Sequence, residues 1–306
     1  MRRLLSALTV VAAAACVAGC DSHRPDGGPV TIAPDPPASH VSNATTAAAQ
    51  ASAYRDGAGV PRDEGRALAL FSEACDGNVA KACGDLGAMY ADGIGVAPDQ
   101  ARAANLFQTA CDGGDLAACA RLGDMARSGV GVTRDEDHAV QLLSRACEGG
   151  LARACTKKGN MVLTGAGVVK NAKRAAVLFR RGCEGGDPEG CVDLGEAYER
   201  GEGVTQTLGE ALDLYDRACT LGSAEGCRQL GEMYSEGRGV ARSPMRSLDL
   251  WSRACDGGDY VGCVELGRLY VSGRGVRTDR DRALALYKKA CDAGTSIGCD
   301  ALKSLR

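Results

Sequence analysis

Fourteen of the sixteen cysteines in this 306-residue chain recur in two regular columns. Members of the first column lie 36 residues apart, and each is followed eight residues later by a member of the second. The pairs are Cys75 and Cys83, Cys111 and Cys119, Cys147 and Cys155, Cys183 and Cys191, Cys219 and Cys227, Cys255 and Cys263, and Cys291 and Cys299. Paired cysteines can form disulfides, hold zinc or supply a nucleophilic thiolate, so the surrounding sequence has to discriminate among three chemistries.

Histidine usage argues against metal. A zinc site would need two cysteine pairs converging on one ion, or one pair completed by histidine. The chain has three histidines: His23 and His40 lie near the N-terminus, and His138 occupies a repeat position that is mostly arginine. The sequence therefore favours structural disulfides over zinc and predicts no metal and no cofactor. If all fourteen thiols are bridged, the repeats hold no free cysteine for covalent catalysis, and no catalytic residue is predicted.

The 36-residue period indicates a solenoid in which each unit packs on its neighbours. Within a unit, one helix is expected over 63–75, with leucine five residues before the first cysteine and a capping side chain at its start. The capping column reads Asp63, Asp99, Asp135, Asn171, Thr207, Ser243 and Asp279. A second helix begins near the second cysteine, as in 191–198, where an apolar face includes a glycine suited to close helix approach. The predicted fold is all-α, an α/α solenoid of antiparallel helix hairpins.

The N-terminus carries the features of an export signal. Arg2 and Arg3 precede an apolar stretch that is too short to span a membrane, and the stretch ends in Val-Ala-Gly-Cys20. That ending resembles the lipobox of bacterial lipoproteins, in which the cysteine is acylated, whereas cleavage by ordinary signal peptidase is the alternative. Lipidation of Cys20 also removes the odd thiol, because Cys16 lies in the discarded segment and fifteen cysteines remain.

We divide the chain into a signal peptide (1–19), a lipidated cysteine with a proline-rich tether (20–46) and a repeat region (47–306). The tether holds five of the nine prolines, and its 26 residues from Asp21 to Thr46 span roughly 30 Å as a coil or up to about 80 Å as polyproline II. Asp21 resembles an inner-membrane retention signal of some bacteria. The expected location is the cell envelope, periplasm-facing or at the cell surface, with membrane contact through the lipid anchor only.

Composition excludes a nucleic-acid partner for the protein as a whole. The formal net charge is −3 and becomes −5 once Arg2 and Arg3 are removed with the signal peptide, which is the wrong sign for a phosphate backbone. Aromatic residues number only 12, so base stacking has little support.

Over about residues 47–306 the repeat resembles Sel-1-like repeats, in the cysteine-rich subfamily typified by the Helicobacter cysteine-rich proteins. The resemblance rests on Ala-Cys-x7-Cys, Leu-Gly-x-x-Tyr, Gly-x-Gly-Val and Ala-Leu-x-Leu. It implies seven repeats and a C-terminal half-repeat forming a TPR-like superhelix, disulfides between adjacent helices, and an adaptor role. We accordingly predict seven bridges, each joining cysteines eight residues apart. An interaction scaffold is the favoured function.

The same resemblance implies an alternative, because some members of that subfamily have been described as penicillin-binding proteins or weak β-lactamases. A serine enzyme of that class needs Ser-x-x-Lys, Ser-Asp-Asn and Lys-Thr-Gly elements, and none of them occurs in the chain. Activity against β-lactams therefore rests on resemblance alone.

Two surface features point to a partner. Positions on the second helix vary between repeats: Asp85 and Ala88 become Lys157 and Asn160, and then Asp193 and Glu196. The window 149–183 contains eight basic residues and no acid, and within it Lys158 replaces a leucine and Val162 replaces a tyrosine. We expect Arg153, Lys157, Lys158 and Lys173 to contact an anionic protein or envelope component, with Lys157 and Lys158 on the concave side; drift among solvated positions is the competing account.

Overall fold

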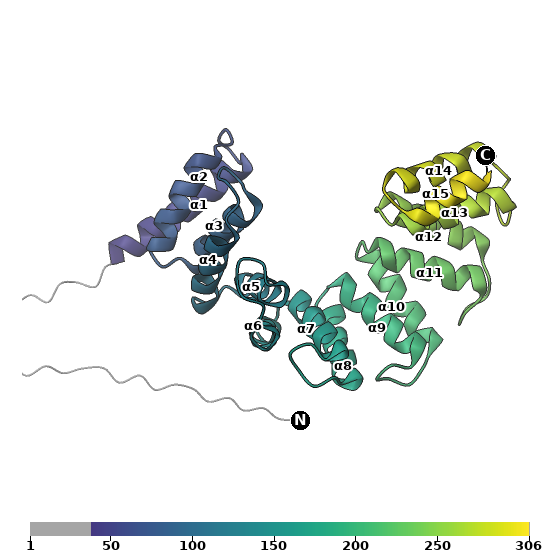
Figure 1. Ribbon diagram of the computed structural model, residues 1–306, viewed down its shortest axis with the longest axis horizontal. Coiled ribbons are helices and arrows are strands. Elements are labelled where there is room, and N and C mark those ends of the chain that lie inside the picture. The colour runs from purple at the N-terminus through teal and green to yellow at the C-terminus, as the bar shows by residue number, and fades with distance from the viewer. Residues whose placement is uncertain (1–37, 306) are drawn as a thin grey trace, which may run out of the picture. The chain divides into compact units, whose positions relative to one another are not determined.

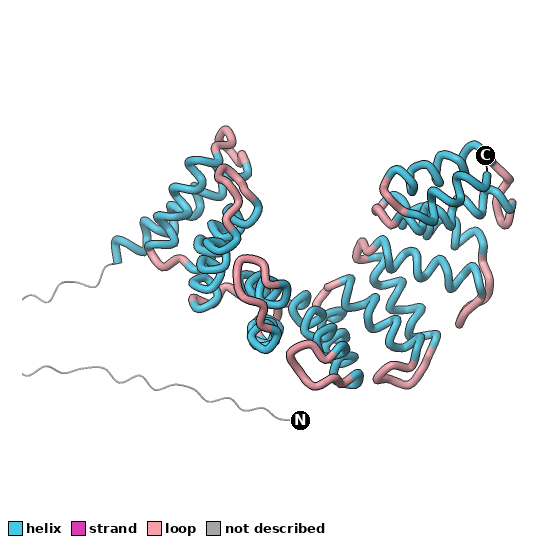
Figure 2. The backbone as a smooth tube through the Cα atoms, viewed as in Figure 1, coloured by secondary structure: helices cyan, strands magenta, loops and turns pink. Residues whose placement is uncertain are grey.

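The structure, a computed structural model, describes residues 38–305 and builds them entirely from helices and loops (Figure 1 and Figure 2). The signal peptide, Cys20 and most of the expected tether lie outside the described residues. The fifteen helices within this range are α1 (Ala38–Asp56), α2 (Glu64–Asp76), α3 (Ala80–Asp92), α4 (Gln100–Asp112), α5 (Leu116–Ser128), α6 (Glu136–Glu148), α7 (Ala152–Thr164), α8 (Ala172–Glu184), α9 (Pro188–Arg200), α10 (Leu208–Thr220), α11 (Ala224–Glu236), α12 (Pro244–Asp256), α13 (Tyr260–Ser272), α14 (Arg280–Asp292) and α15 (Ser296–Leu305).

The helices alternate between two kinds. The even-numbered helices, here called B helices, run from a capping side chain to the first cysteine. The odd-numbered ones are here called A helices and carry the second cysteine from α3 onward. From α2 onward each helix packs against the next along the chain, and α9 also contacts the A helices α7 and α11 on either side. This confirms the predicted all-α solenoid of repeating hairpins.

The B helices begin where the capping column places them. The residue before each B helix is the expected one, and Asp63, Asp99, Asp135, Asn171 and Asp279 each accept a hydrogen bond from a backbone N–H in the first turn. Such a bond satisfies a donor that the helix itself leaves free. Thr207 and Ser243 occupy the same position without a side-chain capping bond. The column therefore predicts the helix start correctly in all seven repeats and the capping bond in five.

A tight loop joins each B helix to the following A helix. The middle residue of this three-residue loop has a positive φ in every repeat, 61° at Asn78 and between 85° and 97° at the equivalent glycines. Because this conformation strains most L-residues, the glycine column is a backbone requirement of the turn. The turn brings the last turn of the B helix beside the first turn of the A helix.

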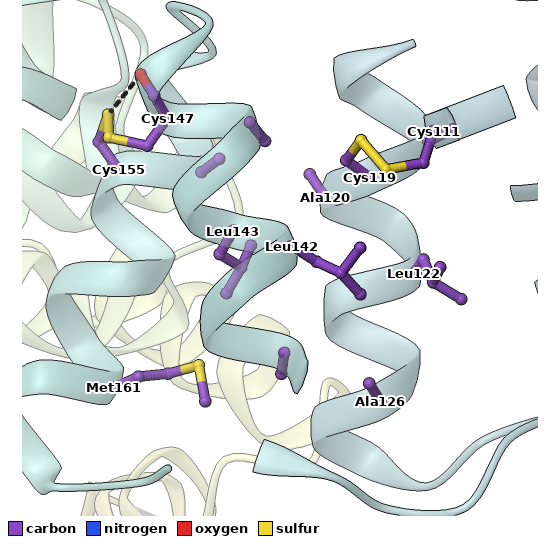
Figure 3. Close-up of a cluster of buried hydrophobic side chains, with 14 of the residues drawn as sticks. Cys111, Cys119, Ala120, Leu122, Ala126, Leu142, Leu143, Cys147, Cys155 and Met161 are labelled. Atoms are coloured by element: carbon purple, nitrogen blue, oxygen red, sulfur yellow. Dashed lines mark hydrogen bonds between the residues drawn. A yellow bond between two sulfur atoms is a disulfide. The ribbon is translucent and has the colours of Figure 1, made fainter. Parts of the chain in front are cut away.

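Seven disulfides cross this loop. Each joins the two cysteines eight residues apart, with Cα–Cα distances between 4.4 and 4.7 Å. These distances lie within the usual range for disulfides. Figure 3 shows two bridges, Cys111–Cys119 and Cys147–Cys155, bordering one cluster of buried side chains. Most of the bridged cysteines are buried.

Between bridges, the core depends on one glycine in each A helix. A Cβ added at Gly195 would lie 2.7 Å from Cε1 of Tyr215, and one added at Gly231 would lie 2.6 Å from Nε1 of Trp251. A Cβ does not approach a non-bonded atom this closely, so the glycine is what allows the ring of the next B helix to pack on the A-helix backbone. The glycine-rich, aromatic-poor composition reflects this packing of large rings on small residues.

The first helix begins inside the segment expected to be tether. α1 starts at Ala38, and its Ala47 and Ala51 are buried against α2 and α3. This helix supplies the cover that the first bridged repeat needs on its open side. No helix within residues 38–305 combines the length and apolar character required to cross a membrane.

Candidate interaction surface

One set of A-helix side chains stays clear of the core in every repeat. These residues lie two and five positions after the second cysteine, and we call them the A-face. None of them is buried, whereas the leucine and glycine between them are buried in most repeats. The A-face comprises Asp85, Ala88, Arg121, Asp124, Lys157, Asn160, Asp193, Glu196, Gln229, Glu232, Glu265 and Arg268.

Neighbouring A helices join through this face. The residue five positions after the second cysteine of one repeat contacts the residue two positions after the second cysteine of the next repeat. The two residues lie 33 apart in the sequence. Lys157 forms an ion pair with Asp124, and Asn160 Nδ2 donates a hydrogen bond of 3.0 Å to Asp193 Oδ2. Polar contacts therefore link α5 to α7, α7 to α9 and α9 to α11, and we call this series of A-face positions the ladder.

The ladder becomes acidic toward the C-terminal repeats. At the last step of the ladder the two residues are both carboxylates, Glu232 and Glu265, and burial raises the pKa of each. Arg228 offsets this repulsion: its Nη1 lies 2.7 Å from Glu232 Oε1 and its Nε 2.9 Å from Asp259 Oδ2. Asp259 also accepts a bond from the N–H of Gly262 at the start of α13. Arg228 thus ties α11 to α13 while partly neutralising the acidic step.

Asp193 has the most displaced pKa on the A-face. Burial raises the pKa of its carboxyl to about 7, the hydrogen bond from Asn160 lowers it, and nearby Glu196 and Glu189 raise it further. The charged form is disfavoured because the group lies partly out of water beside like charges. The α7–α9 contact accordingly carries a carboxyl that changes charge near neutral pH.

We expect the stability of the repeat region to depend on pH through Asp193. Because its folded-state pKa lies above the ordinary value of 3.8, its contribution to stability is full below about pH 4 and is lost as the pH rises through about 7. Asp193→Asn, which keeps a hydrogen-bond acceptor for Asn160, should stabilise the protein by about 1–2 kcal/mol at pH 8 and leave stability at pH 4 nearly unchanged. Chemical denaturation at both pH values measures this. An equal effect of Asp193→Asn at pH 4 and pH 8 would contradict the assignment.

A mixed-charge hollow opens on the A-face between α5 and α7. It has a volume of about 710 Å³ and is lined by acidic and basic side chains together, among them Asp124, Arg134, Glu136, Lys157, Asn160 and Glu189. This lining suits a polar chain segment with both charges better than an apolar ligand.

The structure separates the four cations expected to bind a partner. Lys157 lines the A-face hollow, and Arg153 lies 3.7 Å from Glu189 with both side chains largely exposed. Lys158 and Lys173 instead line a second hollow, together with Arg174, Val177 and Leu178 of α8. The adjacent residues Lys157 and Lys158 therefore serve different surfaces, because successive helical residues point about 100° apart.

The described residues contain no cluster of three or more histidine, cysteine, aspartate or glutamate side chains arranged to hold a metal. The cysteines that could have supplied such a site are paired in disulfides within each repeat. Disulfides at this number are typical of proteins exported to an oxidising compartment.

These features define an α-helical repeat protein with a polar face on its A helices. The Sel1 repeat model matches residues 45–79, 80–115, 116–151, 152–187, 188–223, 224–259 and 261–295. The chain belongs to the Sel1 repeat family. Proteins built from such repeats are generally protein–protein interaction scaffolds. No curated protein matches the chain in sequence.

Two solved structures share this architecture over most of the chain. A Sel1 repeat protein from Oxalobacter formigenes is 27% identical, with a TM-score of 0.75, over 80% of this chain and 99% of that one. A protective antigen of uropathogenic Escherichia coli strains is 28% identical, with a TM-score of 0.69, over 86% of this chain; the match spans 56% of the antigen's own length. Cysteine-rich protein B of Helicobacter pylori is 29% identical over 43% of this chain and 94% of that one, with a TM-score of 0.36.

The sequence shows which A-face positions vary but not which of them touch. The signal for contact is the spacing of 33 residues, three short of the repeat, which links the fifth position of one repeat to the second of the next. Arg228 directly follows the second cysteine, at a position that holds a small or apolar residue in most other repeats. An arginine at this position is the sequence feature that could have indicated its contact with α13.

Proposed function

We propose that the protein is an envelope-anchored interaction scaffold that contacts its partner through the A-face. One observation carries this proposal: the packing positions keep their residue types from repeat to repeat, whereas the A-face positions change charge in almost every repeat and remain accessible to solvent. A surface that varies on a constant scaffold is what an extended recognition site requires.

The envelope location is supported by two independent features. The lipobox-like ending at Cys20 predicts an acylated N-terminus, and the seven disulfides suit an oxidising compartment. Lipid attachment at the N-terminus would hold the protein at the membrane, and the tether would let the repeats bind a partner at some distance from the membrane surface.

Site-specific crosslinking in native envelopes tests the interaction role. A photoreactive residue at Asn160, on the A-face, should yield an adduct with a defined protein, and the same residue at Asn105, exposed on the B helix α4, should not. Glu196→Lys should reduce the Asn160 adduct at least about threefold, because it reverses a charge beside the contact. Equal yields at Asn160 and Asn105 would contradict a contact through the A-face.

Activity against β-lactams is supported only by the resemblance to the cysteine-rich subfamily. If the purified oxidised protein hydrolysed a β-lactam above the buffer control after metal chelation, that alternative would replace the scaffold role.

A further inference from the structure

We propose that the exposed side of α8 and the loop before it dock on the surface of an anionic lipid bilayer. We call this surface the α8 basic face. The proposal builds on the envelope location inferred above, since a bilayer must be within reach. The α8 basic face consists of Lys158, Val169, Lys170, Lys173, Arg174 and Val177.

Its cations have no acidic partners. Within the described part of the chain, Lys158, Lys170, Lys173 and Arg174 form no ion pair, whereas the nearby Lys157 pairs with Asp124 and Arg153 approaches Glu189. No acidic residue lies between residues 149 and 183, so an ion pair here needs a carboxylate from outside this segment, as Lys157 and Arg153 have. Lys158, Lys173 and Arg174 line one hollow, and Lys170 is exposed in the loop directly before α8. Unpaired cations gathered in this way on a protein with net negative charge form a local positive potential.

Arg174 is free because its usual aromatic partner has been lost. In four other repeats the equivalent arginine lies over a tyrosine of the preceding A helix: Arg102 is 4.3 Å from the ring centre of Tyr90, and Arg246 is 5.0 Å from that of Tyr234. In α7 the tyrosine is replaced by Val162, which is buried. Without the ring, Arg174 lacks this cation–π contact, although it is exposed to solvent like the equivalent arginines of the other repeats.

Lys158 adds a cation from a position that normally belongs to the core. The equivalent residue is a buried leucine in the other A helices from α3 to α13, as at Leu122 and Leu194. Lys158 is only half-buried and lines a hollow of about 330 Å³ together with Lys173, Arg174, Val177 and Leu178. Two packing residues have thus been exchanged in one repeat. Lys158 adds a positive charge beside α8, and Val162 removes the aromatic contact that the equivalent arginine has elsewhere.

Exposed apolar side chains accompany the cations. Val169 is 82% exposed and Val177 is 59% exposed. In the other repeats the position of Val177 holds alanine or a polar residue, including Asp213 and Asp249. Cations that attract lipid headgroups and apolar side chains that enter the interface are the two contributions by which a surface helix binds an anionic bilayer. An acidic protein would use the cations but has no need of isolated exposed valines.

Vesicle co-sedimentation tests the proposal. The mature chain carrying Cys20→Ser, exported so that its disulfides form, should bind phosphatidylcholine vesicles that contain phosphatidylglycerol and not vesicles of phosphatidylcholine alone. Lys173→Glu with Arg174→Glu should weaken binding at least about tenfold. The matched control, Lys288→Glu with Lys303→Glu, makes the same charge change in the last repeats and should alter binding less than about twofold. Val177→Ser should weaken it about threefold. Mass spectrometry under non-reducing conditions confirms that each variant keeps its bridges.

Four results would overturn the proposal: equal binding to vesicles without phosphatidylglycerol; equal loss in the control pair; displacement by inorganic phosphate at matched ionic strength, which would indicate a small-anion site; and binding to polyglutamate but not to vesicles, which would indicate an acidic protein. Since the assay uses neither the lipid anchor nor a protein partner, its failure would leave the anchor and the A-face crosslinking results unaffected.

Discussion

Complete reduction of the seven disulfides should abolish cooperative folding of the repeat region at ordinary temperatures. In the chain-entropy model each eight-residue loop contributes about 2.5 kcal/mol, so seven independent loops contribute at most roughly 17 kcal/mol. Ordinary folded domains are stable by about 5–15 kcal/mol. Loss of even half of the disulfide contribution therefore removes most of the margin. Because most of the bridges are buried, the protein must be reduced under mildly denaturing conditions. Its folding is then measured after the denaturant has been removed.

Single bridges should contribute unequally according to their place in the array. Cys147→Ala with Cys155→Ala removes a buried bridge between two packed repeats and should cost about 2–3 kcal/mol in denaturant unfolding. Cys291→Ala with Cys299→Ala removes a partly exposed bridge in the last hairpin and should cost less, because fewer neighbours depend on it. Retention of the parent's unfolding midpoint after full reduction, with free thiols counted to prove it, would show that packing alone holds the solenoid.

Cys20→Ser should eliminate fatty-acid attachment and release the protein from the membrane fraction. An acylated cysteine is the only anchor that the sequence predicts, and single-point attachment through covalent lipid is lost when the thiol is lost. Labelling cells with radioactive palmitate and isolating the protein measures the attachment directly. The expected signal in Cys20→Ser is the background level.

Cys16→Ser provides the matched control for that experiment. It also removes one thiol, but from the segment expected to be discarded, so labelling should persist at the parent's level. Both variants should keep the seven bridges, since the repeat cysteines are unchanged. Palmitate incorporation into Cys20→Ser at the parent's level would contradict the lipobox assignment.

The architecture of the repeat region follows from local sequence signals. Spacing of cysteines, leucines and capping residues at one period specified helix starts, the turn glycines and the hairpin order, because each of these signals acts within a few residues along the chain. The aspartate and asparagine caps and the positive φ of Asn78 illustrate this locality. The boundary of the tether was less accurate: α1 extends back to Ala38, where no repeat residue marks its start.

Which surface residues act together depends instead on how the helices pack in space. The sequence places Lys157 and Lys158 side by side, yet one lines the A-face hollow and the other faces α8. Asp193 of α9 meets Asn160 of α7, and Arg174 has no aromatic ring to lie over because Val162 stands where four other repeats have a tyrosine. Contacts of this kind depend on how adjacent repeats stack, which no local pattern encodes. The charge of a residue can be read from its type, but whether that charge is free is decided by its neighbours in space.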